Sequence, residues 1–164
     1  MSDLRIIPPS RVVRGVDPFG SGAFGASRAR WTAGTELNAK VQYTHKGLDF
    51  VVAPGAYIPC PCDAWIIRTG IAYSDEVNNP RLSEDQVLGS IRLEWAEDPA
   101  WQLKYLYARP IYKGGFPFRV DGGIPFAVVQ SVARRYPGIV NHCHVEIRHR
   151  GVLVDPATIL MEQA

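Results

Sequence analysis

The chain has 164 residues, of which 46% are hydrophobic and 21% are charged, and its net charge is +2. These values predict one globular domain with a single hydrophobic core. The basic residues form groups too short to indicate a nucleic-acid surface, so nucleic acid is not an expected partner. No run of about 18 apolar residues is present, which argues against membrane insertion, and the first residues lack the apolar segment of a signal peptide.

The predicted elements follow in chain order. Residues 1–13 contain Pro8 and Pro9 and have no regular period, so they predict an N-terminal arm outside the core, with residues 14–164 as the domain. The 13 prolines and 15 glycines separate short segments rich in β-branched and aromatic residues. These segments predict an all-β domain of antiparallel sheets. Strands are expected at 49–52, 64–70, 89–97, 103–108, 117–120, 124–130 and 142–149, with a long polar loop at 73–86 and a helical turn near 131–136.

Two stretches contain residues that suit metal binding. His142 and His144 are two positions apart on a predicted strand, so their rings point to the same side with Cα atoms about 7 Å apart. A polar stripe on an exposed strand explains this pair equally well. His45 and Asp49 would lie about 13 Å apart on a straight strand, and they can reach one cation only if Gly47 allows the chain to bend. Otherwise Asp49 caps a turn and His45 lies on the surface.

Considered together, His45, Asp49 and one histidine of the "HCH" segment make a set of two imidazoles and one carboxylate. Three protein ligands with a fourth position open are typical of catalytic zinc. The same ligand types also suit iron(II), so the residues alone leave the metal open.

Four segments, "DPFGSGAFGASR", "THKGLDFVVAPGAYIPCPCDAWIIRTG", "FRVDGGIPFAVVQ" and "NHCHVEI…VLVDPATIL", extend this pattern over about residues 15 to 160. They resemble, in this order, the motifs of the lysostaphin-like, LytM-type zinc endopeptidases, which cut peptides in bacterial peptidoglycan. The resemblance implies a LytM-type, β-sandwich-like core with Zn²⁺ as the cofactor. It also implies that His45, Asp49 and His144 are the zinc ligands and that His142 is a catalytic histidine. Glu146 is expected to support a ligand rather than to be one.

The sequence departs from the family at one catalytic position. Where the family has a second catalytic histidine in a Tyr-x-His segment, this chain reads "LYARP" and has Arg109. An arginine stays protonated and cannot act as a base, but it can donate hydrogen bonds to a developing oxyanion. We therefore expect Arg109 to stabilise charge, and losing one such stabiliser typically costs about 100- to 1,000-fold in rate. Cys60 and Cys62, where the family has small apolar residues, are expected to be buried free thiols.

The expected function is zinc-dependent cleavage of peptide bonds in peptidoglycan. The alternative is a structural or wall-binding module that keeps the peptidase fold with weakened or no activity, and a third, more distant hypothesis is a zinc hydrolase of another peptide. Because no signal peptide precedes the domain, we expect synthesis in the cytoplasm and delivery to the wall by a phage virion, as a tail or baseplate protein, or by a lysis system. The N-terminal arm is the expected contact with such tail proteins.

Overall fold

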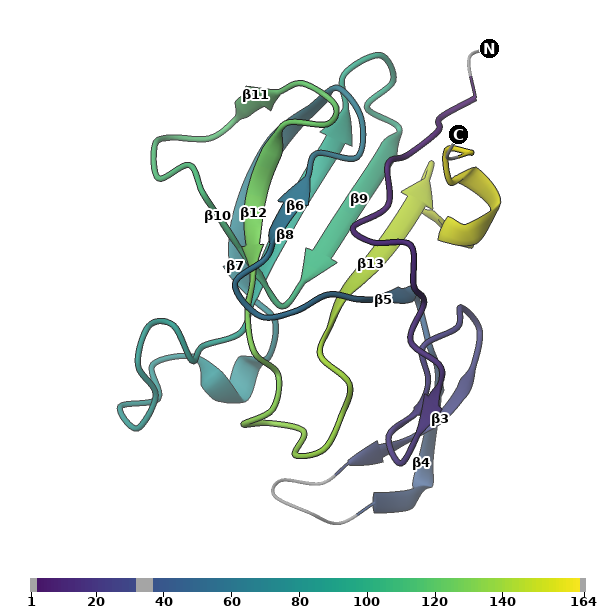
Figure 1. Ribbon diagram of the computed structural model, residues 1–164, viewed down its shortest axis with the longest axis vertical. Helices are drawn as coiled ribbons and strands as arrows, with labels where there is room; N and C mark the ends of the chain where they lie inside the picture. The colour runs from purple at the N-terminus through teal and green to yellow at the C-terminus, as the bar shows by residue number, and fades with distance from the viewer. Residues whose placement is uncertain (1–2, 32–36, 163–164) are drawn as a thin grey trace.

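The computed structural model describes residues 3–31 and 37–162. Its regular secondary structure is almost entirely antiparallel strand, joined by turns and loops (Figure 1). The large sheet has the order β11-β7-β8-β9-β13-β14, and β5 pairs with β13 as well. Its strands are β5 (Leu48–Val51), β7 (Ala64–Ile71), β8 (Gly89–Trp95), β9 (Trp101–Leu106), β11 (Phe118–Val120), β13 (His142–His149) and β14 (Val152–Val154). The all-β fold predicted from the sequence is confirmed.

A second, smaller sheet covers part of the first. It has the order β10-β12-β6, with strands β10 (Ala108–Pro110), β12 (Pro125–Val129) and β6 (Tyr57–Pro59). Figure 1 shows β6 and β12 drawn over β7 and β8. The ring of Tyr105 in β9 meets that of Phe126 in β12 edge to face at 5.2 Å, so the core lies between the two sheets.

Short elements complete the chain. Two hairpins, β1 (Val16–Asp17) with β2 (Gly20–Ser21) and β3 (Ser27–Trp31) with β4 (Leu37–Thr44), precede the large sheet, and the 3₁₀ turns are η1 (Ser74–Glu76) and η2 (Pro156–Ile159). The helical turn expected near 131–136 is present as a single turn, in which the amide of Tyr136 donates to the carbonyl of Val132 at 3.0 Å. The two strands on either side of the glycine turn at 121–124 belong to different sheets, since β11 pairs with β7 and β12 pairs with β6. No helix among the described residues is long and apolar enough to cross a membrane.

The N-terminal segment corrects the boundary drawn from the sequence. Leu4 and Ile6 are fully buried and belong to the main core cluster. The amide of Ile6 donates to the carbonyl of Ile159 at 2.9 Å, and the amide of Val51 in β5 donates to the carbonyl of Val12 at 2.7 Å. The segment lacks the period of a strand because it joins the domain through isolated bridges, so residues 3–13 are part of the domain and not an arm outside the core.

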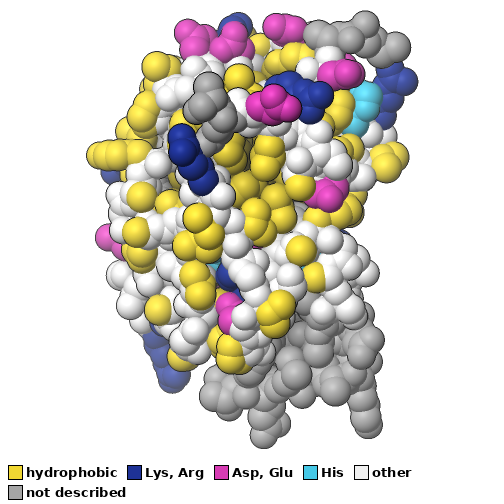
Figure 2. All heavy atoms as spheres, turned by 45° about the vertical axis from the view of Figure 1, so that its right-hand side comes forward, with side chains coloured by type: hydrophobic (Ala, Val, Ile, Leu, Met, Phe, Trp, Pro, Cys, Tyr) yellow, Lys and Arg dark blue, Asp and Glu magenta, His cyan; other side chains and the backbone are white. Residues whose placement is uncertain are grey.

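The outer side of this segment remains at the surface. Figure 2 turns the molecule from the view of Figure 1 so that its right-hand side comes forward. Hydrophobic side chains are spread over the middle of the face shown, and charged ones gather near its upper edge. Val12, Val13 and Val16 have exposed side chains. The segment therefore buries Leu4 and Ile6 and leaves its later valines in contact with solvent.

Replacing Ile6 with alanine is expected to lower the free energy of unfolding by about 2–5 kcal/mol, because it removes a side chain that is 0% exposed from the core. The control is Val12→Ala at a 57% exposed position, which should change stability by about 0.5 kcal/mol or less. Urea unfolding followed by tryptophan fluorescence measures both. Equal midpoints for Ile6→Ala and the parent protein would show that the segment stands apart from the core.

Candidate metal centre

The site is assembled by pairing between β5 and β13. In this antiparallel pair Asp49 lies directly opposite His144, and His142 lies opposite Val51. His45 comes from the loop just before β5. Its amide donates to the carbonyl of Ala26 at 2.8 Å, and its carbonyl accepts from the amide of Gly25 at 2.9 Å. Strand register and loop hydrogen bonds thus bring together residues almost 100 positions apart in the sequence.

Three side chains of the site converge on one point. His45 Nε2 lies 3.0 Å from His144 Nδ1 and 3.2 Å from Asp49 Oδ1, and His144 Nδ1 lies 2.8 Å from Asp49 Oδ1. Zinc bonds of about 2.0–2.1 Å in a tetrahedron place neighbouring ligand atoms about 3.3 Å apart. All three residues are buried, and among the described residues they are the group of ligand atoms close enough to hold one metal ion. The donor types and their spacing fit zinc with one position left for a further ligand.

The second nitrogen of each imidazole is occupied, which fixes the ring orientation. His45 Nδ1–H donates to the carbonyl of Ala23 at 2.8 Å, and His144 Nε2–H donates to Glu146 Oε1 at 3.0 Å. The nitrogens left for a metal are therefore His45 Nε2 and His144 Nδ1, which are the two that face each other. Glu146 therefore accepts a hydrogen bond from one of the candidate ligands.

Gly47 leaves room for the ligand histidine. A Cβ atom at this position would lie 2.3 Å from the carbonyl oxygen of Val145 and 2.8 Å from two ring atoms of His144. The chain bends at Gly47, as predicted from the sequence, and His45 Nε2 comes within 3.2 Å of Asp49 Oδ1, although the φ angle of Gly47 is not in the positive range. The loop needs glycine because it passes directly over β13 and the His144 ring.

Arg14 is a buried partner of the site that sequence reasoning missed. Its side chain is 1% exposed, and its Nε and Nη2 atoms donate to Asp49 Oδ2 at 3.1 and 3.0 Å. Its Nη1 atom donates to Asp17 Oδ2 at 2.6 Å and to the carbonyl of Gly20 at 2.9 Å. Arg14 thus binds one oxygen of Asp49 and leaves the other, Oδ1, facing the two histidines.

The electrostatics keep Asp49 ionised. Burial alone would raise the pKa of Asp49, but hydrogen bonds from His144 and His45 and the charges of His142 and His144 hold it well below its usual range. Burial would lower the pKa of His144, but its hydrogen bonds to Asp49 and Glu146 outweigh burial and raise it. A proton and a metal ion therefore compete for His144 Nδ1, and binding the metal releases that proton.

His142 lies beside the three converging side chains without being one of them. Its Nδ1–H donates to the carbonyl of Val140 at 2.8 Å, and its Nε2 lies 3.6 Å from Asp49 Oδ2. Burial lowers the pKa of His142 more than the Asp49 carboxylate raises it. At neutral pH the ring is therefore neutral, with its Nε2 lone pair directed toward the site, which suits a proton acceptor.

Arg109 is predicted to stabilise charge at the site, but its side chain is bound to residues outside the site. Its guanidinium forms ion pairs of 2.5 Å with Glu84 and with Asp85, both in the loop between η1 and β8. The side chain from this part of the chain that packs against the histidines is Tyr107, in the bend between β9 and β10, and its ring meets that of His142 edge to face at 5.2 Å. Tyr107 has a φ of 68°, which is uncommon for a non-glycine residue. Its hydroxyl lies 2.6 Å from that of Tyr73.

The three cysteines are buried free thiols, as predicted. Burial raises the pKa of Cys60 and of Cys62 to about 12, and it also raises that of Cys143. None of them is close enough to the histidine and aspartate side chains to join the group of ligand atoms. Neutral thiols in the core act as small hydrophobic side chains.

Replacing Glu146 with alanine is expected to weaken zinc binding about 10- to 100-fold, because His144 loses the acceptor that orients its ring. Glu146→Gln keeps an acceptor oxygen and should recover most of the affinity. Competition with a chromogenic zinc chelator measures all three proteins. Equal zinc affinity for the alanine variant and the parent protein would mean that strand packing alone positions His144.

Comparisons with known proteins agree with this architecture. No family model matches the sequence. Among solved structures, the chain aligns with Csd3 of Helicobacter pylori at a TM-score of 0.59 and 15% identity, over 98% of this chain and 36% of that one. It aligns with a Pseudomonas aeruginosa protein assigned as an M23 peptidase at a TM-score of 0.51 and 19% identity, over 70% of this chain and 43% of that one. The chain has an M23 peptidase-like fold. This is the fold that the LytM-type motifs implied.

A curated relative adds a similarity in sequence. Myeloid protein 1 of Gallus gallus is 29% identical over 144 residues, which cover 84% of this chain and 35% of that protein. The chain therefore spans less than half the length of each of these three proteins. The similarity to the two solved structures establishes the fold of the chain and not its activity.

Proposed function

We propose that this chain is a zinc-dependent hydrolase of peptide bonds in bacterial peptidoglycan, with slow turnover. The observation that carries the proposal is the convergence of His45 Nε2, Asp49 Oδ1 and His144 Nδ1 within 3.2 Å of one another, with His142 beside them. A zinc ion bound there would supply a Lewis acid that polarises a peptide carbonyl and activates water. The M23-like fold and the LytM-type motifs support the choice of substrate.

Each residue of the site has a distinct task in this proposal. His45, Asp49 and His144 hold the metal, and Arg14 keeps the second carboxylate oxygen of Asp49 away from it. His142 accepts a proton at Nε2 during attack and returns it to the leaving amine, since its Nδ1–H is fixed by the carbonyl of Val140. The chain thus provides one histidine for proton transfer, where the LytM-type motif has two.

Arg109 limits the rate in this scheme. To stabilise an oxyanion, its guanidinium would have to leave Glu84 and Asp85, and both of those carboxylates are largely exposed. Exposed ion pairs of this kind are worth about 0–1 kcal/mol each, so the pairs can be exchanged for a substrate contact. The same pairs favour a second candidate function, a zinc-holding structural or wall-binding module without turnover, because they hold the arginine away from His142.

The experiment measures the release of new amino termini from purified peptidoglycan by proteins at equal zinc occupancy. The hydrolase proposal expects slow release by the parent protein and none by His142→Ala, although that variant still holds zinc. Arg109→His should raise the rate, and Arg109→Ala should lower it about 100-fold if the guanidinium reaches the oxyanion.

His149→Ala is the matched control, because His149 is on the same strand but stacks on Trp101, with ring centroids 4.1 Å apart. It should release peptide at the parent rate. No release by a zinc-loaded parent protein would exclude the hydrolase and select the structural module. Release that survives His142→Ala would contradict the role given to that histidine. Delivery of the domain to the wall by a phage particle stays a prediction.

A further inference from the structure

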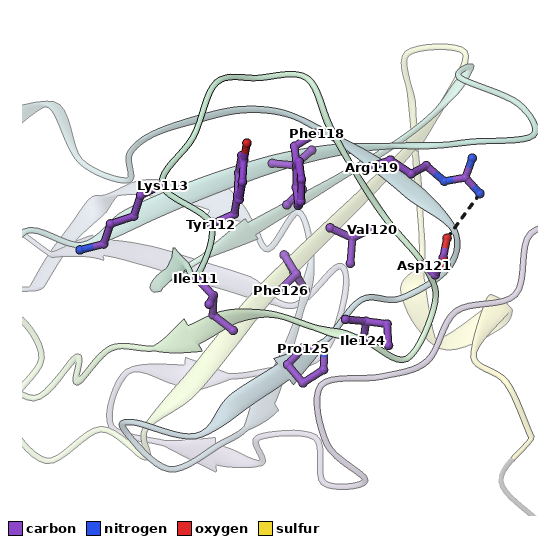
Figure 3. A pocket seen from close by; sticks show the side chains of 11 residues that line it. Ile111, Tyr112, Lys113, Phe118, Arg119, Val120, Asp121, Ile124, Pro125 and Phe126 are labelled. Atoms are coloured by element: carbon purple, nitrogen blue, oxygen red, sulfur yellow. Dashed lines mark ion pairs between the residues drawn. The ribbon is translucent and has the colours of Figure 1, made fainter.

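A cavity in the molecule lies apart from the metal centre. Its volume is about 580 Å³, and it opens between β7 and β11 of the large sheet and β12 of the small sheet (Figure 3). Its lining includes Ile66, Tyr112, Phe118, Val120, Ile124 and Phe126, and it contains no residue of the metal centre. This volume is in the range of small-molecule sites, about 300–1,000 Å³.

The floor and walls of this cavity are apolar. Ile66, Val120 and Phe126 are buried and belong to the main core cluster, so the cavity extends the space between the two sheets to the surface. The rings of Tyr112 and Phe118 stack at 3.6 Å with an angle of 7° between them. In Figure 3 these rings stand on one side of the cavity, and Ile111, Pro125 and Ile124 lie on the other. The cavity therefore has a stacked aromatic pair on one side and aliphatic side chains on the other.

Large apolar side chains are also exposed at the mouth. Ile124 is 55% exposed and Ile111 is 43% exposed, and both line the cavity. Leaving such groups in water costs about 25 cal/mol per Å² of apolar surface, and a ligand that covers them recovers this free energy. An exposed apolar surface that leads into a cavity with a core floor is typical of a binding site for an apolar group.

The charges at the rim are not equivalent. Arg119 points away from the cavity, and its Nη2 atom lies 3.6 Å from a carboxylate oxygen of Asp121 and 3.7 Å from one of Asp63. Lys113 lines the opposite end, beyond Tyr112, and in Figure 3 its ammonium group also extends outward. Unlike Arg119, it has no ion pair with any residue that the structure describes, so its long side chain can turn toward a ligand at the mouth. The apolar cavity thus has one unpaired positive charge at one end.

We propose that this cavity binds an amphipathic monoanion, an elongated apolar molecule with a single terminal carboxylate. The carboxylate lies at Lys113, and the apolar part lies along the Tyr112 and Phe118 rings over the floor of Ile66, Val120 and Phe126. An anion is favoured over a cation because the free charge at the rim is positive, and a neutral molecule would leave that charge without a partner. The site is independent of the metal centre, so it stands whichever function the metal centre has.

The test titrates the zinc-loaded protein with sodium decanoate below its micelle concentration, followed by calorimetry and by amide chemical shifts. We expect one decanoate per chain, shifts confined to the residues of the cavity, weaker binding of decan-1-ol, and weaker still of decyltrimethylammonium. Equal binding of all three compounds would overturn the assignment of an anion. No saturable binding of decanoate up to about 1 mM, which corresponds to a free energy of about −4 kcal/mol, would overturn the site.

Three exposed substitutions locate the ligand. Ile124→Asp places a carboxylate at the mouth and should weaken decanoate binding at least tenfold. Lys113→Gln removes one exposed ion pair and should weaken decanoate two- to fivefold while leaving decan-1-ol unchanged. Val152→Asp, at a 68% exposed position in β14, is the matched control and should bind like the parent protein. If Ile124→Asp and Val152→Asp weaken binding equally, decanoate adheres to the surface and the proposal is wrong.

Discussion

Asp49→Ala is expected to abolish zinc binding and also to lower the free energy of unfolding by about 3–5 kcal/mol in the presence of a chelator. The first effect follows because Asp49 provides the only carboxylate of the ligand group. The second follows because Arg14, which is 1% exposed, loses the carboxylate that accepts two of its hydrogen bonds. Removing one partner of a buried ion pair typically costs this much, and Arg14 would keep only Asp17 as a carboxylate partner.

The two effects of Asp49→Ala are separated by a double variant. Arg14→Met with Asp49→Leu replaces both partners by apolar side chains of similar size, so it should recover much of the lost stability without recovering zinc. Urea unfolding with excess chelator measures stability, and elemental analysis of the dialysed proteins measures zinc. A single variant as stable as the parent protein in chelator would show that Arg14 does not depend on Asp49.

Gly47→Ala is expected to lower both zinc affinity and stability through packing alone. Its added methyl group would lie 2.3 Å from a backbone carbonyl oxygen, and backbone cannot rotate away as the end of a side chain can. Either the loop with His45 or the strand with His144 must shift. We expect zinc affinity to fall by at least tenfold, and stability by about 1–3 kcal/mol, the usual cost of forcing an extra methyl group into a packed site.

The control for Gly47→Ala is Gly15→Ala, next to Arg14, where an added Cβ meets nothing within 4 Å. That variant should bind zinc and unfold like the parent protein. Zinc competition and urea unfolding measure both variants. The close contact with Val145 implies that the loop cannot move away from β13. Parent-like zinc affinity in Gly47→Ala would contradict this.

The sequence predicted the central strands well because each carries a strong pattern. In β8 buried and partly buried residues alternate along the whole strand, and β13 reproduces the predicted range 142–149. One missed strand, β4 with the sequence LNAKVQYT, alternates apolar and polar residues and carried a signal that the prediction did not use. Other missed strands are short or polar, such as β6 with three residues and β3 with the sequence SRARW. Such segments become strands because a neighbouring strand pairs with them, and pairing between distant segments is not visible in a local pattern.

The N-terminal segment failed as a prediction for the same physical reason. Two prolines and irregular spacing correctly excluded a regular strand, but they did not reveal that Leu4 and Ile6 fill the space beside η2. Burial without secondary structure leaves no periodic signal.

The three residues of the candidate metal centre could be selected from the sequence because two motifs in fixed order contain them, whereas the partners that hold them could not. Arg14 meets Asp49 across 35 positions of sequence, and nothing in "RVVRGVD" distinguishes it from a surface arginine. The position of Arg109 was evident from the Tyr-x-His pattern, but the direction of its side chain depends on Glu84 and Asp85, which come from a long polar loop. Contacts set by the tertiary fold have to be read from the structure.

X-ray absorption at the zinc edge, on protein purified without added metal, tests the metal centre most directly. The account predicts one zinc per chain surrounded by nitrogen and oxygen neighbours at about 2.0–2.1 Å, with imidazole scattering from two histidines and no sulfur. His45, Asp49 and His144 provide these donors. Either of two results would contradict the account. A sulfur shell at about 2.3 Å would place the zinc on cysteine thiolates, and protein that stays free of zinc on reconstitution would exclude a zinc site.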